Sequence, residues 1–381
     1  MINIFQPSLG KEELDALKDV FKSNWVGRGP KTEQFEIKFA EKIGVDSENV
    51  CTVGGCTQGI NTILEILGLN KNDEVIVPSL SFIGIANSVV RSGSKIVFCE
   101  VDERTMNTNL RYISDVITEN TKVLILIHYG GYPCVDMDKI IELCNSKNII
   151  VIEDNACSPF SKYKGKNTGT LADFGVWSFD AMKVMTTGDG GMIYCKDKKI
   201  MLQLRKHLYF GLSSKSGLSN KVDERWWEFD IISSGGKSIV NDIISVIGLE
   251  QLKKVDNFLK KRKKITCFYN ENFRKLKWIK TPFDVLDGNK SSYYMYWIQL
   301  ENQIIRDGLA QFLRKNDVYT TFRYYPLHWV DFYKDMVGEN FTLKNTESAA
   351  LNTLCIPIHP GLTDDDIEYI VNLIKEYENK L

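Results

Sequence analysis

The feature that most constrains the fold of this chain is an almost unbroken apolar run at residues 122–131 (KVLILIHYGG), which ends in two glycines. A strand without polar alternation is typical of a parallel sheet that helices cover on both faces. Shorter apolar runs end at Phe82 (EVIVPSLSF), at Asp102 (KIVFCEVD) and at Asp154 (NIIVIED). Strands that alternate with helices over about the first 195 residues predict an α/β layer with a mostly parallel sheet.

Two helices are also predicted before this layer in the sequence. Apolar residues recur at helical spacing over residues 11–22 and again over residues 31–42. Residues 24–30 (NWVGRGP) lie between the two, and their glycines and proline end a helix. Residues 49–68 predict a strand, a glycine turn and then a helix that Thr57 is suited to cap.

The second half of the chain has a different character. Residues 206–238 are polar and glycine-rich, with Trp226 and Trp227 near the middle, and a loop of this length is usually functional or disordered. A long helix is predicted to start near Asn241. Its basic run at residues 253–264 suits a solvated helix face better than a nucleic-acid patch.

A smaller unit closes the chain. It contains two predicted strands and two predicted helices, at residues 293–300, 318–326, 306–315 and from Thr363 onward. Thr363 with Asp366 resembles a capping box at the start of the last helix. We therefore predict a large domain with the N-terminal helices at residues 1–245, and a linking helix with a small C-terminal domain at residues 246–381.

The charge balance excludes some classes of function. The chain has 48 basic and 49 acidic residues, a net charge of -1, so no strong field draws it to nucleic acid or to an anionic membrane. No stretch approaches about 18 apolar residues and no signal peptide is visible, which favours the cytoplasm as the compartment. The nine cysteines and four histidines show no metal-ligand spacing, so no metal site is predicted.

Several reactive side chains are predicted at the carboxyl ends of the strands, where ligands bind in such sheets. Lys183 lies between a strand end and a glycine-rich turn. Asp154 ends a buried strand, where a carboxylate needs a cationic partner. Residues 55–57 (GCT) form a glycine turn at a helix N-terminus, whose free N–H groups favour a phosphate. Ser178 can add a hydroxyl there, and Phe82 can cover a flat ring.

Each of these residues also has an ordinary structural explanation. Lys183 alone is a surface lysine, and Asp154 alone is a helix cap or a salt-bridge partner. The glycine turn is a plain turn, and Phe82 is a core side chain. The hypothesis of an active site therefore depends on the combination of these residues and not on any one of them.

The combination resembles a known family. In chain order, the segments GCTQGINTILEI, VPSLSFIG, HYGG, VIEDNACS, WSFDAMK and TTGDGGMI are similar to the DegT/DnrJ/StrS sugar aminotransferases, which have the aspartate aminotransferase fold. The resemblance extends to both ends of the chain. It implies an α/β architecture of fold-type I, with pyridoxal phosphate as the cofactor. It also implies a homodimer with shared active sites, which moves an amino group from L-glutamate to a keto sugar, usually nucleotide-linked, for amino-sugar biosynthesis.

The resemblance implies roles for the reactive residues. Lys183 corresponds to the Schiff-base lysine, Asp154 to the partner of the pyridine nitrogen, and Phe82 to the side chain that stacks on the ring. The dehydratase branch of the family has histidine where Lys183 stands, so the lysine favours amino transfer.

The implied phosphate site combines side chains and backbone. Ser178 and Thr57, with the backbone near Gly55 and Cys56, are expected to hold the phosphate. The family has an asparagine that reaches the phosphate of the neighbouring subunit, whereas this chain has Lys237 in SSGGKS. A lysine can still bind phosphate, as a point charge.

Other expected contacts depart from the family or concern the substrate. Cys157 stands where the family commonly has histidine or glutamine near the phenolic oxygen of the cofactor. Arg323 is a candidate clamp for the carboxylate of glutamate or for a substrate phosphate. Trp226 or Trp227 is a candidate stacking surface in the sugar pocket.

Two alternatives stay open on the sequence alone. One is an aminotransferase that acts on a small phosphorylated ketone, which the SSGGKS departure allows. The other is a non-catalytic regulator of the same fold that binds the cofactor or a sugar. The presence of both Lys183 and Asp154 argues against the second alternative.

Overall fold

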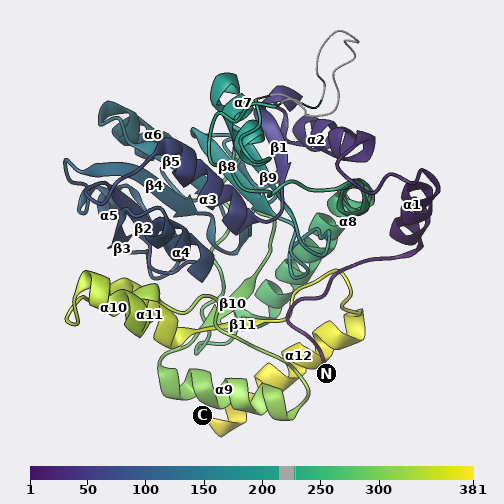
Figure 1. Ribbon diagram of the computed structural model, residues 1–381. Coiled ribbons are helices and arrows are strands. Elements are labelled where there is room, and N and C mark those ends of the chain that lie inside the picture. The colour runs from purple at the N-terminus through teal and green to yellow at the C-terminus, as the bar shows by residue number, and fades with distance from the viewer. Residues whose placement is uncertain (214–226, 228) are drawn as a thin grey trace.

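The chain folds around one seven-stranded sheet in a computed structural model that describes residues 1–213, 227 and 229–381 (Figure 1). The strand order is β1-β9-β8-β5-β4-β2-β3. Strands β3, β2, β4, β5 and β8 pair in parallel, whereas β9 is antiparallel to both β8 and β1. The strands span Val50–Val53 (β1), Glu74–Pro78 (β2), Lys95–Cys99 (β3), Thr121–Ile127 (β4), Ile150–Asp154 (β5), Phe174–Ser178 (β8) and Gly191–Cys195 (β9).

The apolar run that predicts a doubly covered sheet forms β4, at the centre of the parallel part. Val123 and Ile125 enter one hydrophobic core, together with residues of α3 and α4. Leu124 and Leu126 enter the opposite core, together with residues of α6. Because successive side chains of a strand point to opposite faces, both faces of β4 are buried and no polar alternation is needed. The predicted α/β layer with a mostly parallel sheet is confirmed.

Helices lie on both faces of the sheet (Figure 1). Helices α3, α4 and α7 pack on one face, and α5, α6, α2 and α8 share cores with the other face. The bounds are Lys11–Lys22 (α1), Pro30–Ile43 (α2), Cys56–Leu67 (α3), Ile83–Arg91 (α4), Leu110–Ser114 (α5), Met137–Ser146 (α6), Lys198–His207 (α7) and Asp242–Phe273 (α8). Two short strands, Lys162–Tyr163 (β6) and Lys166–Asn167 (β7), form a separate hairpin. No helix in the described ranges is long and apolar enough to cross a membrane.

A smaller unit lies beyond α8, around a two-stranded antiparallel ladder (Figure 1). Its elements are β10 (Tyr296–Gln299), α9 (Gln303–Lys315), α10 (Asp331–Val337), α11 (Lys344–Asn352), β11 (Thr353–Ile356) and α12 (Asp364–Tyr377). The N-terminal arm crosses to this unit, where Ile2 pairs in parallel with Val318. The proposed domain boundary at residue 245 falls in the first turn of α8, and the division stays a prediction.

Most of the predicted elements are confirmed, and three predictions are wrong. Residues 318–326 form no strand but make isolated bridges through Val318 and Thr321, because the residues that follow turn towards the aromatic cluster described below. The strand predicted at 293–300 begins only at Tyr296. Helix α3 begins at Cys56 after an N-cap glycine, so Thr57 lies inside its first turn and does not cap it. The capping box at Thr363 is confirmed.

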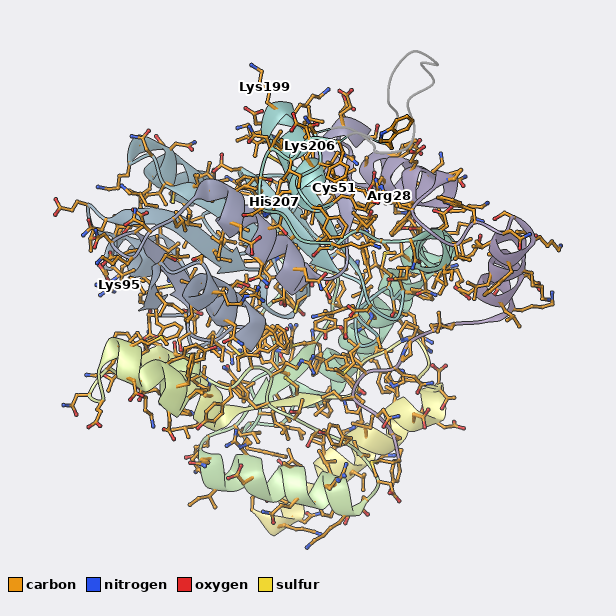
Figure 2. The ribbon with its side chains drawn as sticks, viewed as in Figure 1. Arg28, Cys51, Lys95, Lys199, Lys206 and His207 are labelled. Carbon is orange, nitrogen blue, oxygen red and sulfur yellow. The ribbon has the colours of Figure 1, made fainter. Side chains whose placement is uncertain are left out.

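A buried carboxylate joins elements on both sides of the β1 edge. Glu36 of α2, which is 4% exposed, accepts hydrogen bonds from the guanidinium groups of Arg28 (3.0 Å) and of Arg205 on α7 (3.0 Å). It also accepts bonds from the backbone N–H (2.7 Å) and hydroxyl (2.8 Å) of Thr52 on β1. Arg28, labelled in Figure 2, also donates from Nη1 to the hydroxyl of Thr52 on β1 (2.9 Å). Burial in itself raises the pKa of Glu36, but the charges of Arg205 and Arg28 hold it below its ordinary value.

We expect Glu36→Gln to lower the free energy of unfolding by about 3–5 kcal/mol, because it leaves two guanidinium groups beside a neutral amide. Urea denaturation followed by tryptophan fluorescence measures this loss. Glu41→Gln, in an exposed ion pair with Lys38, is the matched control and should change the free energy by less than about 1 kcal/mol. Since the pKa of Glu36 is depressed in the folded chain, its contribution holds above the ordinary carboxyl range and is lost as the pH falls. Equal loss in the two variants would contradict the prediction.

Candidate active site

Lys183 lies on the turn between the antiparallel strands β8 and β9. Its backbone N–H donates to Asp180 O (3.0 Å), and the neck of the turn is closed by bonds from Phe179 to Gly190 (2.8 Å) and from Thr187 to Phe179 (2.9 Å). The Lys183 amine lies 5.1 Å from the ring centre of Tyr294. The turn therefore holds the lysine at the end of β8, beside the end of β5.

Asp154 is the last residue of β5 and is 2% exposed. Its Oδ1 accepts a hydrogen bond from Ala156 N–H (2.8 Å) and lies 3.8 Å from the thiol of Cys56. Burial raises the pKa of Asp154, and the nearby positive charge of Lys183 opposes that rise. No lysine, arginine or histidine in the described ranges forms an ion pair with this carboxylate. The cationic partner expected for Asp154 is therefore not supplied by a salt bridge within those ranges.

The N-terminus of α3 forms the next part of the site. Gly55 is the N-cap, and no side chain caps the helix, so the first N–H groups, from Cys56 on, point out of the helix end. Strand β9 starts in close contact with this end: a Cβ on Gly191 would lie 2.6 Å from the carbonyl oxygen of Trp177 and 3.0 Å from the nitrogen of Cys56. The glycine of TTGDGGMI thus permits a close approach that any larger residue would prevent.

The structure brings the other predicted phosphate residues to the same place. Ser178 pairs in register with Gly191, and its hydroxyl accepts from Asp180 N–H (3.3 Å). A Cβ on Gly84 would lie 2.4 Å from the Thr57 hydroxyl and 3.0 Å from the Phe82 ring, so the start of α4 lies against the start of α3. Residues 55–57, Ser178 and Phe82 are therefore neighbours.

Phe82 and Cys157 flank a tyrosine that the sequence analysis did not single out. Phe82 is 47% exposed, which corrects its ordinary explanation as a core residue, and its ring centre lies 6.0 Å from that of Tyr324. The buried Cys157 thiol lies 3.1 Å from the Tyr324 hydroxyl. Burial raises the pKa of Cys157, so the thiol stays protonated at neutral pH.

Arg323 also belongs to this group of residues. Its guanidinium lies 4.9 Å from the ring centre of Phe5 and 5.6 Å from that of Tyr324. It lies 4.0 Å from the sulfur of Met182, the residue before Lys183. No carboxylate in the described ranges pairs with Arg323, and its buried Nε has no hydrogen-bond partner there. A purely structural ion pair would be the ordinary role of such an arginine, and none is found for Arg323 in those ranges.

The remaining predicted residues lie outside this group. Lys237 is exposed, and its backbone pairs with Tyr209. The next residue, Ser238, accepts from Gly54 N–H (2.8 Å), so this segment lies beside the start of α3. Trp227 is 60% exposed, and Trp226 lies outside the described residues.

Sequence reasoning missed Phe5, Tyr294 and Tyr324, which complete the surroundings of Lys183. Tyr294 stacks on Phe5 with ring centres 4.9 Å apart and planes at 6°. The dense aromatic segments YYMYWIQL and VYTTFRYYP are the available signal for the two tyrosines, but their composition predicts strands.

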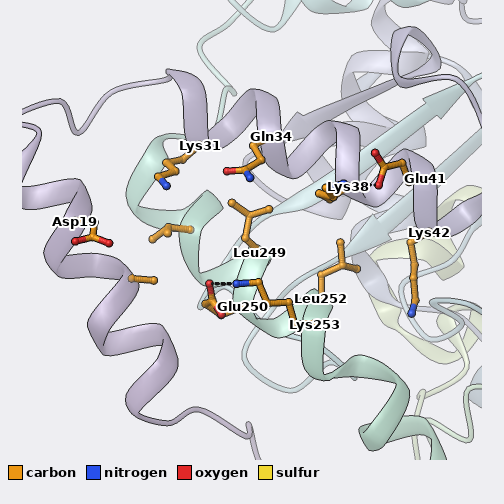
Figure 3. A pocket seen from close by; sticks show the side chains of 12 residues that line it. Asp19, Lys31, Gln34, Lys38, Glu41, Lys42, Leu249, Glu250, Leu252 and Lys253 are labelled. Carbon is orange, nitrogen blue, oxygen red and sulfur yellow. Dashed lines mark hydrogen bonds and ion pairs between the residues drawn. The ribbon is translucent and has the colours of Figure 1, made fainter.

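Two hollows on the surface differ in whether the predicted site residues line them. A hollow of about 540 Å³ lies between α1, α2 and α8, where Lys31, Glu250 and Lys253 surround Leu249 and Leu252 (Figure 3). None of the predicted site residues lines it. A smaller hollow of about 290 Å³ between α3 and α4 does include Thr57.

Comparison with known proteins identifies the family of the chain. The model of the DegT/DnrJ/EryC1/StrS aminotransferase family matches residues 7–375. The dTDP-4-dehydro-2,3,6-trideoxy-D-glucose 4-aminotransferase of Saccharopolyspora spinosa is 39% identical over 98% of this chain and 95% of its own length. The crystal structure of the aminotransferase TlmJ from Streptoalloteichus hindustanus is 40% identical, covers 100% of this chain and 99% of its own, and superposes with a TM-score of 0.93. The PMP-form of Spr1654 from Streptococcus pneumoniae has a TM-score of 0.92 at 25% identity, with 100% of both chains covered.

These matches confirm the predicted α/β architecture of fold-type I and pyridoxal phosphate as the cofactor. The chain belongs to the DegT/DnrJ/EryC1/StrS aminotransferase family and is a pyridoxal phosphate-dependent aminotransferase.

Proposed function

We propose that this aminotransferase moves an amino group from L-glutamate to a keto sugar linked to a nucleotide, in the biosynthesis of an amino sugar for a surface polysaccharide or glycan. The observation that carries the proposal is the buried Asp154 carboxylate, which has no ion pair in the described ranges and lies within electrostatic reach of the Lys183 amine. The relative from Saccharopolyspora spinosa is named for a dTDP-linked dehydro sugar, which supports a nucleotide-linked keto substrate.

The residues present fit pyridoxal phosphate in charge and in hydrogen-bonding capacity. A buried carboxylate without an ion pair stays ionised only beside a cation, and a protonated pyridine nitrogen is one. The uncapped start of α3 offers N–H groups and a positive dipole end to a phosphate. Tyr294 and Arg323 also carry buried polar atoms that no partner within the described residues satisfies.

When bound, the cofactor supplies an aldehyde that takes up amino groups and a ring that withdraws electrons. Lys183 would hold the aldehyde carbon through its amine. Once freed, this amine would act as a base towards the α-carbon proton of the amino acid and then as an acid towards C4′. Asp154 keeps the proton on the ring nitrogen.

Lys183 starts from a charged state. Burial lowers the pKa of its amine, but the acidic groups around it, Tyr294, Tyr324, Cys157 and Asp154, raise that pKa well above its ordinary value. Of these groups, Asp154 has the lowest ordinary pKa. Pairing its charge with the ring nitrogen removes an attraction that holds the proton on Lys183, which prepares the amine to act as a base.

The remaining contacts orient the cofactor and the substrates. Ser178 and Thr57 bind the phosphate together with the backbone of residues 55–57, and Phe82 covers the ring. Cys157 donates its S–H near the phenolic oxygen, because its raised pKa keeps the thiol neutral. Arg323 binds a carboxylate of glutamate or a substrate phosphate, since it has no acidic partner in the described ranges.

We also propose a homodimer in which the two sites are shared. Lys237 is exposed on a segment that borders the start of α3, where a point charge from the partner subunit can reach the phosphate. Large apolar side chains are exposed near this segment, which is typical of an interface: Tyr209, Phe210, Ile231 and Ile232. Trp226 or Trp227 is proposed to stack on the substrate at this edge.

We expect Lys183→Ala to lower kcat by at least about 10²–10⁴-fold, the usual contribution of a positioned acid and base. The loaded enzyme should also lose the change in visible absorbance that glutamate causes in the wild type. Steady-state assays and absorbance spectra measure the two effects. Lys199→Ala, on the exposed start of α7 (Figure 2), is the control and should change neither. Activity of Lys183→Ala within tenfold of the wild type would remove Lys183 from this role.

We expect Asp154→Asn to slow the half-reaction with glutamate by about 10²–10³-fold, because an amide cannot stabilise the charge on the ring nitrogen. In the wild type, the raised pKa of Asp154 in the empty site lets a proton compete with the ring cation. The affinity of the apoenzyme for the cofactor should therefore fall as the pH falls through that pKa, and Asp154→Asn should lack this dependence. Stopped-flow absorbance and equilibrium titration measure these effects. A variant with the same pH dependence as the wild type would contradict the assignment.

The acceptor is identified by a direct assay. Purified enzyme with L-glutamate should release 2-oxoglutarate when dTDP- or GDP-linked keto sugars are added. It should release little with small phosphorylated ketones, because these lack the nucleotide. Turnover of only the phosphorylated ketones would overturn the proposed substrate. Failure of every amino acid to react with the loaded enzyme would overturn the proposed transfer itself.

A further inference from the structure

The Lys183 amine faces an aromatic ring and not a carboxylate. Its Nζ lies 5.1 Å from the ring centre of Tyr294, within the range of about 6 Å in which a cation is attracted to an aromatic face. No ion pair in the described ranges includes Lys183. Asp154 acts on Lys183 from farther away than a salt bridge, since each charge shifts the pKa of the other residue.

The ring of Tyr294 also packs on a second aromatic ring. Phe5 stacks on it at 4.9 Å with planes at 6°, and the guanidinium of Arg323 lies 4.9 Å from the ring centre of Phe5. Each of the two stacked rings thus has a cation near its ring centre, and both rings are buried. Phe5 reaches this place because the N-terminal arm pairs with the smaller unit, where Ile2 contacts Val318.

The backbone of Tyr294 is held by a buried arginine that forms no ion pair within the described part of the chain. Arg262 of α8, which is 1% exposed, donates from Nη1 to the carbonyl oxygens of Tyr294 (3.1 Å) and Ile358 (2.9 Å). Burial lowers the pKa of Arg262 to about 10. The next residue, Met295, donates its N–H to Gly130 (3.1 Å). Contacts from α8, from the β11–α12 connection and from the end of β4 thus determine where the ring lies.

We propose that Tyr294 is a positioning residue whose ring face holds the Lys183 ammonium group whenever that amine is not bonded to the cofactor. The inference rests on the proposed role of Lys183 and extends it. An aromatic face attracts a cation but has no lone pair that takes its proton, whereas a carboxylate competes for that proton. The ring therefore stabilises the protonated amine near the reacting atoms without accepting a hydrogen bond from it as a carboxylate would.

The other groups that face the amine come from four segments. They are Asp154 at the end of β5, Cys157 after it, Cys56 at the start of α3, and Tyr324 in the segment before α10, whose ring Arg323 contacts. Cys56 and Cys157 have raised pKa values and stay neutral, so Asp154 and Arg323 are the charged groups. Neither is replaced in the variants proposed below.

The test uses the apoenzyme, so that it does not depend on turnover. Acetylation of Lys183 by acetic anhydride, followed by mass spectrometry across a pH series, gives the pKa of the amine in the wild type, Tyr294→Phe and Tyr294→Leu. We expect Tyr294→Phe, which keeps the ring, to match the wild type. We expect the pKa of Lys183 in Tyr294→Leu to fall by about 0.5–1.5 pH units, because the ammonium group loses its contact with the aromatic ring. Tyr293→Leu, whose ring packs on Tyr132, is the neighbouring control and should leave the value unchanged.

An equal pKa in the wild type and a folded Tyr294→Leu would overturn the proposal. If that variant does not fold, a crystal structure of the wild-type apoenzyme decides: Nζ of Lys183 over the Tyr294 ring supports the proposal, and Nζ elsewhere overturns it. Failure of the proposed function is a separate result. It would appear as a wild-type enzyme whose cofactor absorbance does not respond to any amino acid, whatever the pKa of Lys183 in the apoenzyme.

Discussion

The site depends on one constraint, the placement of two adjacent carboxylates on opposite faces of a buried strand. Glu153 and Asp154 are both buried at the end of β5. Glu153 is saturated, because it accepts from Gly169 N–H (2.8 Å), Leu171 N–H (2.8 Å), Ala172 N–H (2.9 Å) and His128 Nε2 (3.0 Å). His128 Nδ1 accepts from Cys134 N–H, which assigns the proton to Nε2. Asp154 accepts one backbone bond and one weak thiol contact. The protein's own donors thus satisfy Glu153, whereas Asp154 is left to pair with a cation that a bound ligand supplies.

The antiparallel strand β9 explains why the phosphate site lies beside that carboxylate. A parallel continuation after β8 would carry the chain away to the far end of the sheet through a long crossover. The turn at residues 179–190 instead returns the chain at once, carries Lys183 and delivers Gly191 against the start of α3. The amine, the carboxylate and the helix end therefore come together through one hairpin, and the hydrogen bonds at its neck limit how far Lys183 can move.

The large sheet and the motif residues could be predicted because their signals are local. The apolar run of β4, the acidic end of β5 and the glycines around α3 each reflect the burial or the close approach that their own backbone requires. The aromatic segments could not be assigned in this way. Residues 318–326 have high strand propensity, yet they make only isolated bridges, and Tyr324 turns to Cys157. The position of Tyr294 depends on Arg262, which lies 32 positions earlier along the chain, and on Phe5 in the N-terminal arm. Such contacts have no periodic signature in the sequence.

The contacts of the Lys183 amine have strengths that suit its proposed role, in which the amine is released from the cofactor and later binds it again. Removing one partner of a buried ion pair costs about 3–5 kcal/mol, so an ion pair would hold the amine in one position. A cation on an aromatic face gains about 0.5–2 kcal/mol, enough to favour one position without trapping it there. Tyr294, which Phe5 of the N-terminal arm stacks on, supplies this weak contact with the amine. The sheet carries Asp154, the carboxylate that is proposed to pair with the ring nitrogen of the cofactor. Tyr294 packs in one hydrophobic core with Trp177 of β8, and the N–H of Met295 donates to Gly130 (3.1 Å), so this weak contact keeps a fixed place beside the sheet.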